Sequence, residues 1–113
     1  MASEQQAPVY HLLLDRDEVP VAAQALRLFI TDEVHQPHIR SLAREVASAL
    51  EGEPDAAGVL TVSLGAEHLK VAFSAIRLLF KDLQRDEAQE RRTLQAILDK
   101  LPDEHSIRAI SLG

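Results

Sequence analysis

The segment 32–40 holds the residues best suited to bind a metal. His35 and His38 lie three residues apart, and two carboxylates, Asp32 and Glu33, precede them. Imidazole and carboxylate groups so close together suit zinc or another divalent ion. Polar residues also gather at helix starts, and the proline between the two histidines is typical of a first helical position. We therefore expect no metal and no cofactor, with His35 and His38 as the weak candidate ligands.

Three carboxylates lie within the stretch DRDE, residues 15–18. Paired carboxylates can carry out acid–base chemistry or hold magnesium. Acidic residues also favour helix starts, and Asp15 with Glu18 three residues on fits a reciprocal capping pair. We favour capping here. The alternative function is a small ligand- or metal-binding protein or an enzyme, with a site near His11, Asp15 and Asp17 or near His35 and His38.

The basic residues offer two further candidate sites. Arg27 and Arg77 lie fifty positions apart in similar segments, so in a symmetric fold they could bind an anion or a partner's carboxylate. A third and weaker function is nucleic-acid regulation through residues of the charged run 85–92, namely Arg85, Arg91 and Arg92. These arginines are too few for a nucleic-acid footprint, and the chain has one tyrosine and no tryptophan for base stacking.

Composition excludes several classes of function. The chain has 113 residues, 46% hydrophobic and 27% charged, with no cysteine and a formal net charge of −6. Disulfides and cysteine nucleophiles are therefore excluded, and the acidic balance disfavours nucleic acid and anionic membranes. We find no glycine-rich phosphate loop, nucleophile elbow or zinc-protease motif. We expect a cytoplasmic protein that is not an enzyme, without a secretory signal or membrane anchor.

Two stretches of the chain resemble each other. ALRLFITDE begins at Ala25 and AIRLLFKDL begins at Ala75, and extending the match at an offset of fifty aligns residues 9–32 with residues 59–82. Each copy begins with a strand pattern, 9–14 or 59–64. In VLTVSL, alternation puts Leu60, Val62 and Leu64 on one face and Val59, Thr61 and Ser63 on the other. A fixed internal period of this kind indicates tandem structural units.

Each strand is followed by two helices. Apolar residues at helical spacing predict a pair after each strand, with a break near residues 84–86, where acidic residues interrupt the apolar stripe. Gly52 is expected to end the second helix in a left-handed conformation. The tail SIRAISL, residues 106–112, predicts a further short strand. The predicted fold is α+β with the order β-α-α-β-α-α-β, in which a small antiparallel sheet carries four helices on one face and the two units are related by a pseudo-twofold axis.

These elements form one domain of 113 residues. Its predicted parts are a disordered N-terminus (1–7), a first βαα unit (8–52), a linker (53–57), a second βαα unit (58–102) and a C-terminal strand (103–113).

The face of the sheet that the helices leave open is the main candidate interface. It should carry His11, Thr61 and Ser63 together with three apolar residues that could contact a partner, Val9, Leu13 and Val59. A second copy or another protein could bury this face. We therefore expect a small cytosolic interaction module that acts as a homodimer or binds another protein, with nucleic acid disfavoured as a partner and no membrane contact.

Overall fold

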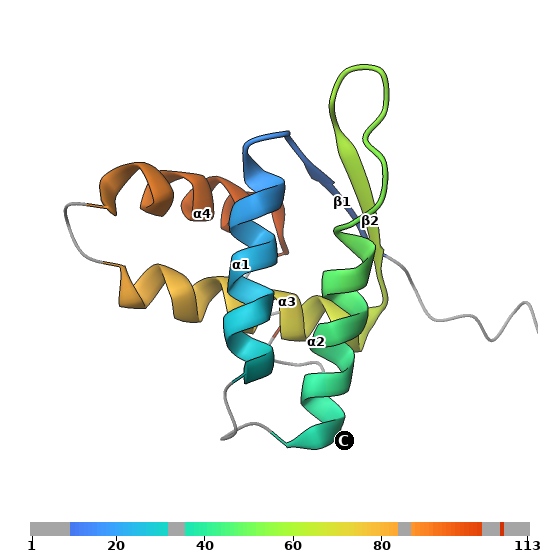
Figure 1. Ribbon diagram of the computed structural model, residues 1–113, viewed down its shortest axis with the longest axis vertical. Coiled ribbons are helices and arrows are strands. Elements are labelled where there is room, and N and C mark those ends of the chain that lie inside the picture. The colour runs from blue at the N-terminus through green and yellow to red at the C-terminus, as the bar shows by residue number, and fades with distance from the viewer. Residues whose placement is uncertain (1–9, 32–35, 84–86, 103–106, 108–113) are drawn as a thin grey trace, which may run out of the picture.

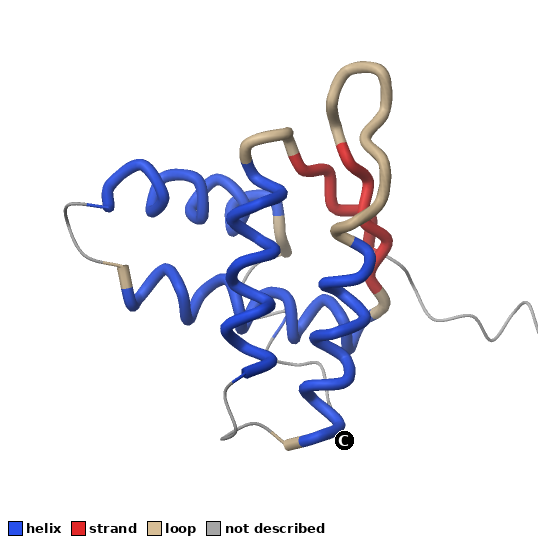
Figure 2. The backbone as a smooth tube through the Cα atoms, viewed as in Figure 1, coloured by secondary structure: helices blue, strands red, loops and turns tan. Residues whose placement is uncertain are grey.

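The computed structural model describes residues 10–31, 36–83, 87–102 and 107. Within them the chain forms an α+β fold with a two-stranded antiparallel sheet and four helices, shown in Figure 1 and, by secondary structure, in Figure 2. The elements in chain order are β1 (Tyr10–Leu14), α1 (Glu18–Thr31), α2 (Pro37–Ala49), β2 (Leu60–Leu64), α3 (Ala66–Asp82) and α4 (Ala88–Lys100).

The two strands confirm the alternation read from the sequence. They pair in antiparallel register, with Leu12 directly opposite Val62. Their inward side chains are buried, apart from that of Tyr10, which is half-buried, and the residues between them are exposed. The hairpin therefore has one face against the helices and one face open, as period-2 patterning requires.

The helix boundaries follow the local signals in the sequence. Pro37 begins α2, where its missing N–H costs little. Gly65 takes the N-cap position of α3. The predicted break is confirmed, because α3 ends at Asp82 and α4 begins at Ala88.

Helix α3 is the central element of the core. It packs against each of the other three helices and against β2, and α1 crosses it in Figure 1. Both crossing helices bury alanines, Ala22 and Ala25 on α1 and Ala72 and Ala75 on α3. Small side chains let two backbones approach closely. The main contacts of the sheet are with α2, α3 and α4, whereas α1 packs mainly on the other three helices. The sequence predicted that all four helices would lie against one face of the sheet.

Two local predictions need correction or lie outside the described residues. Gly52 does not have a positive φ, and the described glycine in the left-handed region is Gly58, with φ of 82°. The chain turns at Gly58 because the Asp55 carboxylate accepts hydrogen bonds from the N–H groups of Ala57 and Val59. The predicted third strand falls on 106–112. Only Ile107 of that segment is described, with helical backbone, and the rest lies outside the described residues, as does the N-terminal segment 1–7.

None of the helices that the structure describes is long and apolar enough to cross a membrane.

Candidate functional site

A buried carboxylate lies where β1 turns into α1. Glu18 is the one charged residue buried among the described residues, with 6% of its surface exposed. Its Oε1 accepts a hydrogen bond from the backbone N–H of Asp15 at 2.7 Å, and its own N–H donates to the Asp15 carbonyl at 2.9 Å. Half of the predicted capping pair is therefore confirmed: the Glu18 side chain reaches back to the turn.

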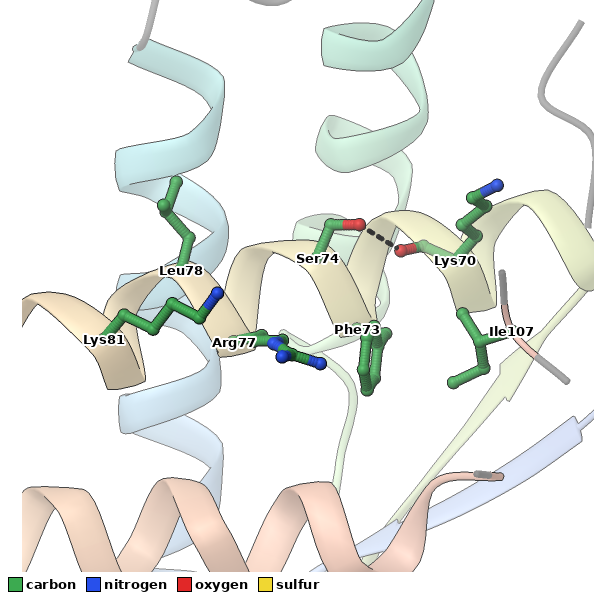
Figure 3. A pocket seen from close by; sticks show the side chains of 7 residues that line it. All are labelled: Lys70, Phe73, Ser74, Arg77, Leu78, Lys81 and Ile107. Carbon is green, nitrogen blue, oxygen red and sulfur yellow. Dashed lines mark hydrogen bonds between the residues drawn. The ribbon is translucent and has the colours of Figure 1, made fainter. Parts of the chain in front are cut away.

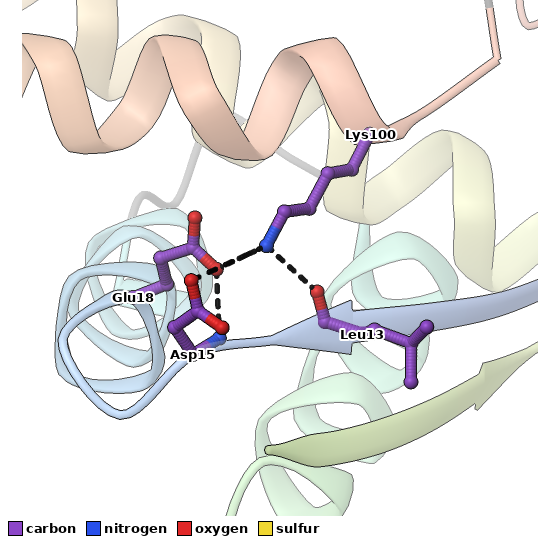
Figure 4. Close-up of polar contacts among 4 residues, drawn as sticks. All are labelled: Leu13, Asp15, Glu18 and Lys100. Carbon is purple, nitrogen blue, oxygen red and sulfur yellow. Dashed lines mark hydrogen bonds and ion pairs between the residues drawn. The ribbon is translucent and has the colours of Figure 1, made fainter. Parts of the chain in front are cut away.

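The partner of this carboxylate comes from the other end of the fold. Figure 4 shows Lys100, at the end of α4, with its Nζ 2.5 Å from Glu18 Oε1 and 3.0 Å from the Leu13 carbonyl oxygen. Asp15 Oδ2 lies 3.9 Å from the same Nζ. The Tyr10 hydroxyl in turn donates to the Lys100 carbonyl. We call these four residues, Tyr10, Asp15, Glu18 and Lys100, the junction clasp.

The clasp is suited to hold elements together rather than to catalyse a reaction. Within the clasp, Glu18 Oε1 accepts hydrogen bonds from a backbone N–H and from an ammonium group, both of this chain. It joins β1, the start of α1 and the end of α4, which are up to 90 residues apart in sequence. A buried charge is tolerated only with such partners.

The other members of the predicted acid–base site are directed elsewhere. His11 lies on the open face of the hairpin, with Nδ1 3.1 Å from Ser63 Oγ. Asp17 lines shallow surface pockets with Arg16. In the part of the chain that the structure describes, no group of three potential ligands could hold a metal.

The predicted metal segment contributes to helix packing. His38 is exposed on α2, with Nε2 3.9 Å from Glu67 on α3. A second histidine, His68 on α3, has Nε2 2.7 Å from Glu45 on α2. Both pairs therefore join α2 to α3. His35 lies outside the described residues.

The open face of the hairpin keeps most of its predicted residues. His11, Leu13, Thr61 and Ser63 are exposed, and Leu13, opposite Thr61, is 52% exposed. Val59 is half-buried, so it contributes less to this face than predicted, and Val9 lies outside the described residues. The apolar part of the face is therefore Leu13.

A groove between α3 and α4 gathers basic and aromatic residues. Figure 3 shows its first pocket, of about 260 Å³, whose lining on α3 includes Lys70, Phe73, Arg77 and Lys81, with Phe73 beside Ile107. A second pocket shares Phe73, Arg77 and Lys81 with the first and reaches α4. A third pocket adjoins the second at Phe80 and extends along α4 to Arg92. We call this surface the α3–α4 groove, defined by Lys70, Phe73, Arg77, Phe80, Lys81 and Arg92.

The arginines named from the sequence have different surroundings. Arg27 is exposed on α1, whereas Arg77 lines the α3–α4 groove with its guanidinium 5.9 Å from the Phe73 ring centre. Arg91 donates to the carbonyls of Phe80 and Leu83, at 3.3 and 3.2 Å, and lies 4.5 Å from the Phe80 ring centre. Arg91 therefore caps the end of α3, and Arg85 lies outside the described residues.

Sequence patterns alone did not indicate a role for Lys100, Lys70 or Lys81. A lysine at the end of a helix is an ordinary feature, and nothing local to Lys100 indicates a carboxylate 82 residues away. Lys70 and Lys81 could have been found by following Arg77 at helical spacing, since all three are basic and lie along α3.

No family model, curated protein or solved structure matches this chain.

Proposed function

We propose that the protein is a non-enzymatic interaction module that forms a weak homodimer through the open face of its hairpin. The observation that carries the proposal is Leu13, 52% exposed on that face. One exposed leucine is common on protein surfaces, but its neighbours His11, Thr61 and Ser63 are formally uncharged with histidine neutral. In a chain of net charge −6, an uncharged face is where two copies meet with least repulsion.

A twofold contact would use the patch around Leu13 on both copies, because a dimer of this symmetry uses the same patch twice. The face is small: two strands of five residues cover about 17 Å by about 10 Å. A stable interface buries about 800 Å² on each partner. We therefore expect a dimer that forms only at high protein concentration.

Sedimentation equilibrium over a range of concentrations tests this proposal. We expect the average mass of the wild type to rise above the 12.5 kDa of one chain, and Leu13→Arg to abolish the rise. Leu28→Arg is the matched control, since Leu28 is 51% exposed on α1, away from the hairpin. A wild type that stays monomeric, or a loss of association in the Leu28 variant alone, would contradict the proposal.

We also propose that the fold is a duplicated βαα unit with pseudo-twofold symmetry. Three observations support this proposal. The strand bounds differ by fifty positions, which is the offset of the sequence match. Leu12 and Val62, matched at that offset, face each other in the register. The contact of α4 with β1 corresponds to that of α2 with β2.

We further propose a cytoplasmic location for the protein, which the absence of cysteine from its sequence favours.

A further inference from the structure

We propose that α4 is a detachable helix, which undocks as a unit while α1, α2, α3 and the hairpin stay folded. Helix α4 contacts α1, α3 and β1 (Figure 1), so undocking would uncover parts of all three elements. The proposal does not rest on the homodimer, because the open face of the hairpin belongs to β1 and β2 alone.

Helix α4 buries fewer side chains than any other helix of the fold. Leu94 and Ile97 are the buried residues among its 13, whereas α2 buries three of 13 and α3 buries six of 17. One more buried leucine follows each of the two shorter helices, Leu101 after α4 and Leu50 after α2. Burial of apolar surface supplies most of the free energy that docks a helix. Undocking α4 therefore exposes less apolar surface than undocking any other helix.

Polar contacts hold both ends of α4 in place. At its start, Arg91 donates to two backbone carbonyls at the end of α3. At its end, Lys100 donates to the Glu18 carboxylate and to the Leu13 carbonyl in the junction clasp. Water takes over such hydrogen bonds when they open, which leaves each of them a modest net contribution. The ends of α4 are therefore fastened by contacts that can be exchanged for water.

The rest of the fold has packing of its own. Helices α1, α2 and α3 pack against one another, and α2 and α3 pack against β2. The two strands pair with each other along five residues, and the pair of His68 with Glu45 joins α3 to α2. None of these contacts uses a residue of α4. Weakly docked elements of a protein open at a lower free energy than the whole, and α4 meets that description.

Exchange of backbone amide hydrogens, followed by NMR on the full chain, tests the proposal. Lys100→Met removes a contact that is absent both from the undocked state and from the globally unfolded state. Val46→Ala is the matched comparison, because Val46 is buried on α2 with 3% exposure and α2 packs on α1 and α3. Global unfolding exposes this site, whereas undocking of α4 leaves it packed.

In the wild type, we expect the amides of α4 to exchange at least about a hundredfold faster than the slowest amides of α3. Lys100→Met should speed exchange about thirtyfold along the whole of α4, from its first turn to its last. Val46→Ala should speed the slowest amides of α3 about thirtyfold and leave the amides of α4 unchanged.

Three results would overturn the proposal. Equal exchange of α4 and α3 in the wild type would mean that α4 leaves only when the whole chain unfolds. Acceleration by Lys100→Met that is confined to the last turn of α4 would mean fraying of one end. Equal acceleration of α4 and α3 by Val46→Ala would mean that both belong to one cooperative unit. The first two results need no α2 variant, so they decide the question even if Val46→Ala does not fold.

Discussion

Replacing Lys100 by methionine tests the junction clasp. Methionine keeps an unbranched apolar side chain of similar length but removes the ammonium that faces Glu18 Oε1 at 2.5 Å and the Leu13 carbonyl at 3.0 Å. The Glu18 carboxylate then remains buried, at 6% exposure, with the N–H of Asp15 as its remaining partner. A buried charge that loses its partner destabilises the folded state.

The size of the effect follows from the exposure of the two side chains. Removing one partner of a fully buried pair costs about 3–5 kcal/mol. The Lys100 side chain is 34% exposed, so water already screens the pair, and the remaining hydrogen bond from Asp15 compensates in part. We therefore expect a loss of about 2 kcal/mol in the free energy of unfolding. With an unfolding entropy near 2.1 cal/mol/K per residue over 113 residues, the midpoint should fall by about 8 °C.

Thermal unfolding followed by circular dichroism measures this loss. Lys81→Met is the matched control, because Lys81 is exposed, and it should change stability by less than about 0.5 kcal/mol. The Glu18→Gln variant and the Glu18→Gln, Lys100→Met double variant complete a cycle with an expected coupling of about 1 kcal/mol. The clasp would be refuted if Lys100→Met unfolded at the same temperature as Lys81→Met, or if the two clasp substitutions were additive.

Two further variants test local features by the same assay. Gly58→Ala should destabilise the fold by about 1 kcal/mol, because φ is 82° there. Gly52→Ala should be nearly neutral, since an added Cβ meets its nearest atoms at an ordinary 3.4 Å. Equal effects of the two substitutions would argue against the assigned turn. Arg91→Ala should lower the free energy of unfolding by about 1–2 kcal/mol, because the carbonyls of Phe80 and Leu83 lose the hydrogen bonds that Arg91 donates. Arg92→Ala should cost little, since Arg92 is exposed. A neutral Arg91 variant would show that α3 ends stably without this cap.

Secondary structure was predictable where the pattern is local. The alternation of VLTVSL predicted a strand within one residue of β2 (Leu60–Leu64), because a half-buried strand must alternate. The start of α2 at Pro37 and the break between α3 and α4 also follow from nearby residues. The glycine assignment failed because Gly52 and Gly58 both follow a helix in a polar loop, and the actual turn depends on the Asp55 side chain.

Tertiary partners were not predictable from these patterns. The sequence indicates that Glu18 caps a turn, but its burial depends on Lys100, 82 residues later. Helical spacing places Val71, Ala75 and Leu78 on one side of α3, yet Val71 and Ala75 are buried and Leu78 is 42% exposed. Periodicity gives the direction of a side chain, and neighbouring helices decide whether that direction is covered. The α3–α4 groove therefore became visible only in the folded chain.

The most direct test of the homodimer is a dilution series of amide NMR spectra recorded on the wild-type protein. If two copies meet through the open face of the hairpin, the concentration-dependent shifts should be confined to the amides of β1 and β2, and largest around Leu13 and the opposite Thr61. The same series on Leu13→Arg should show no such shifts. Shifts centred on α3 and α4, or none at any concentration, would contradict the account.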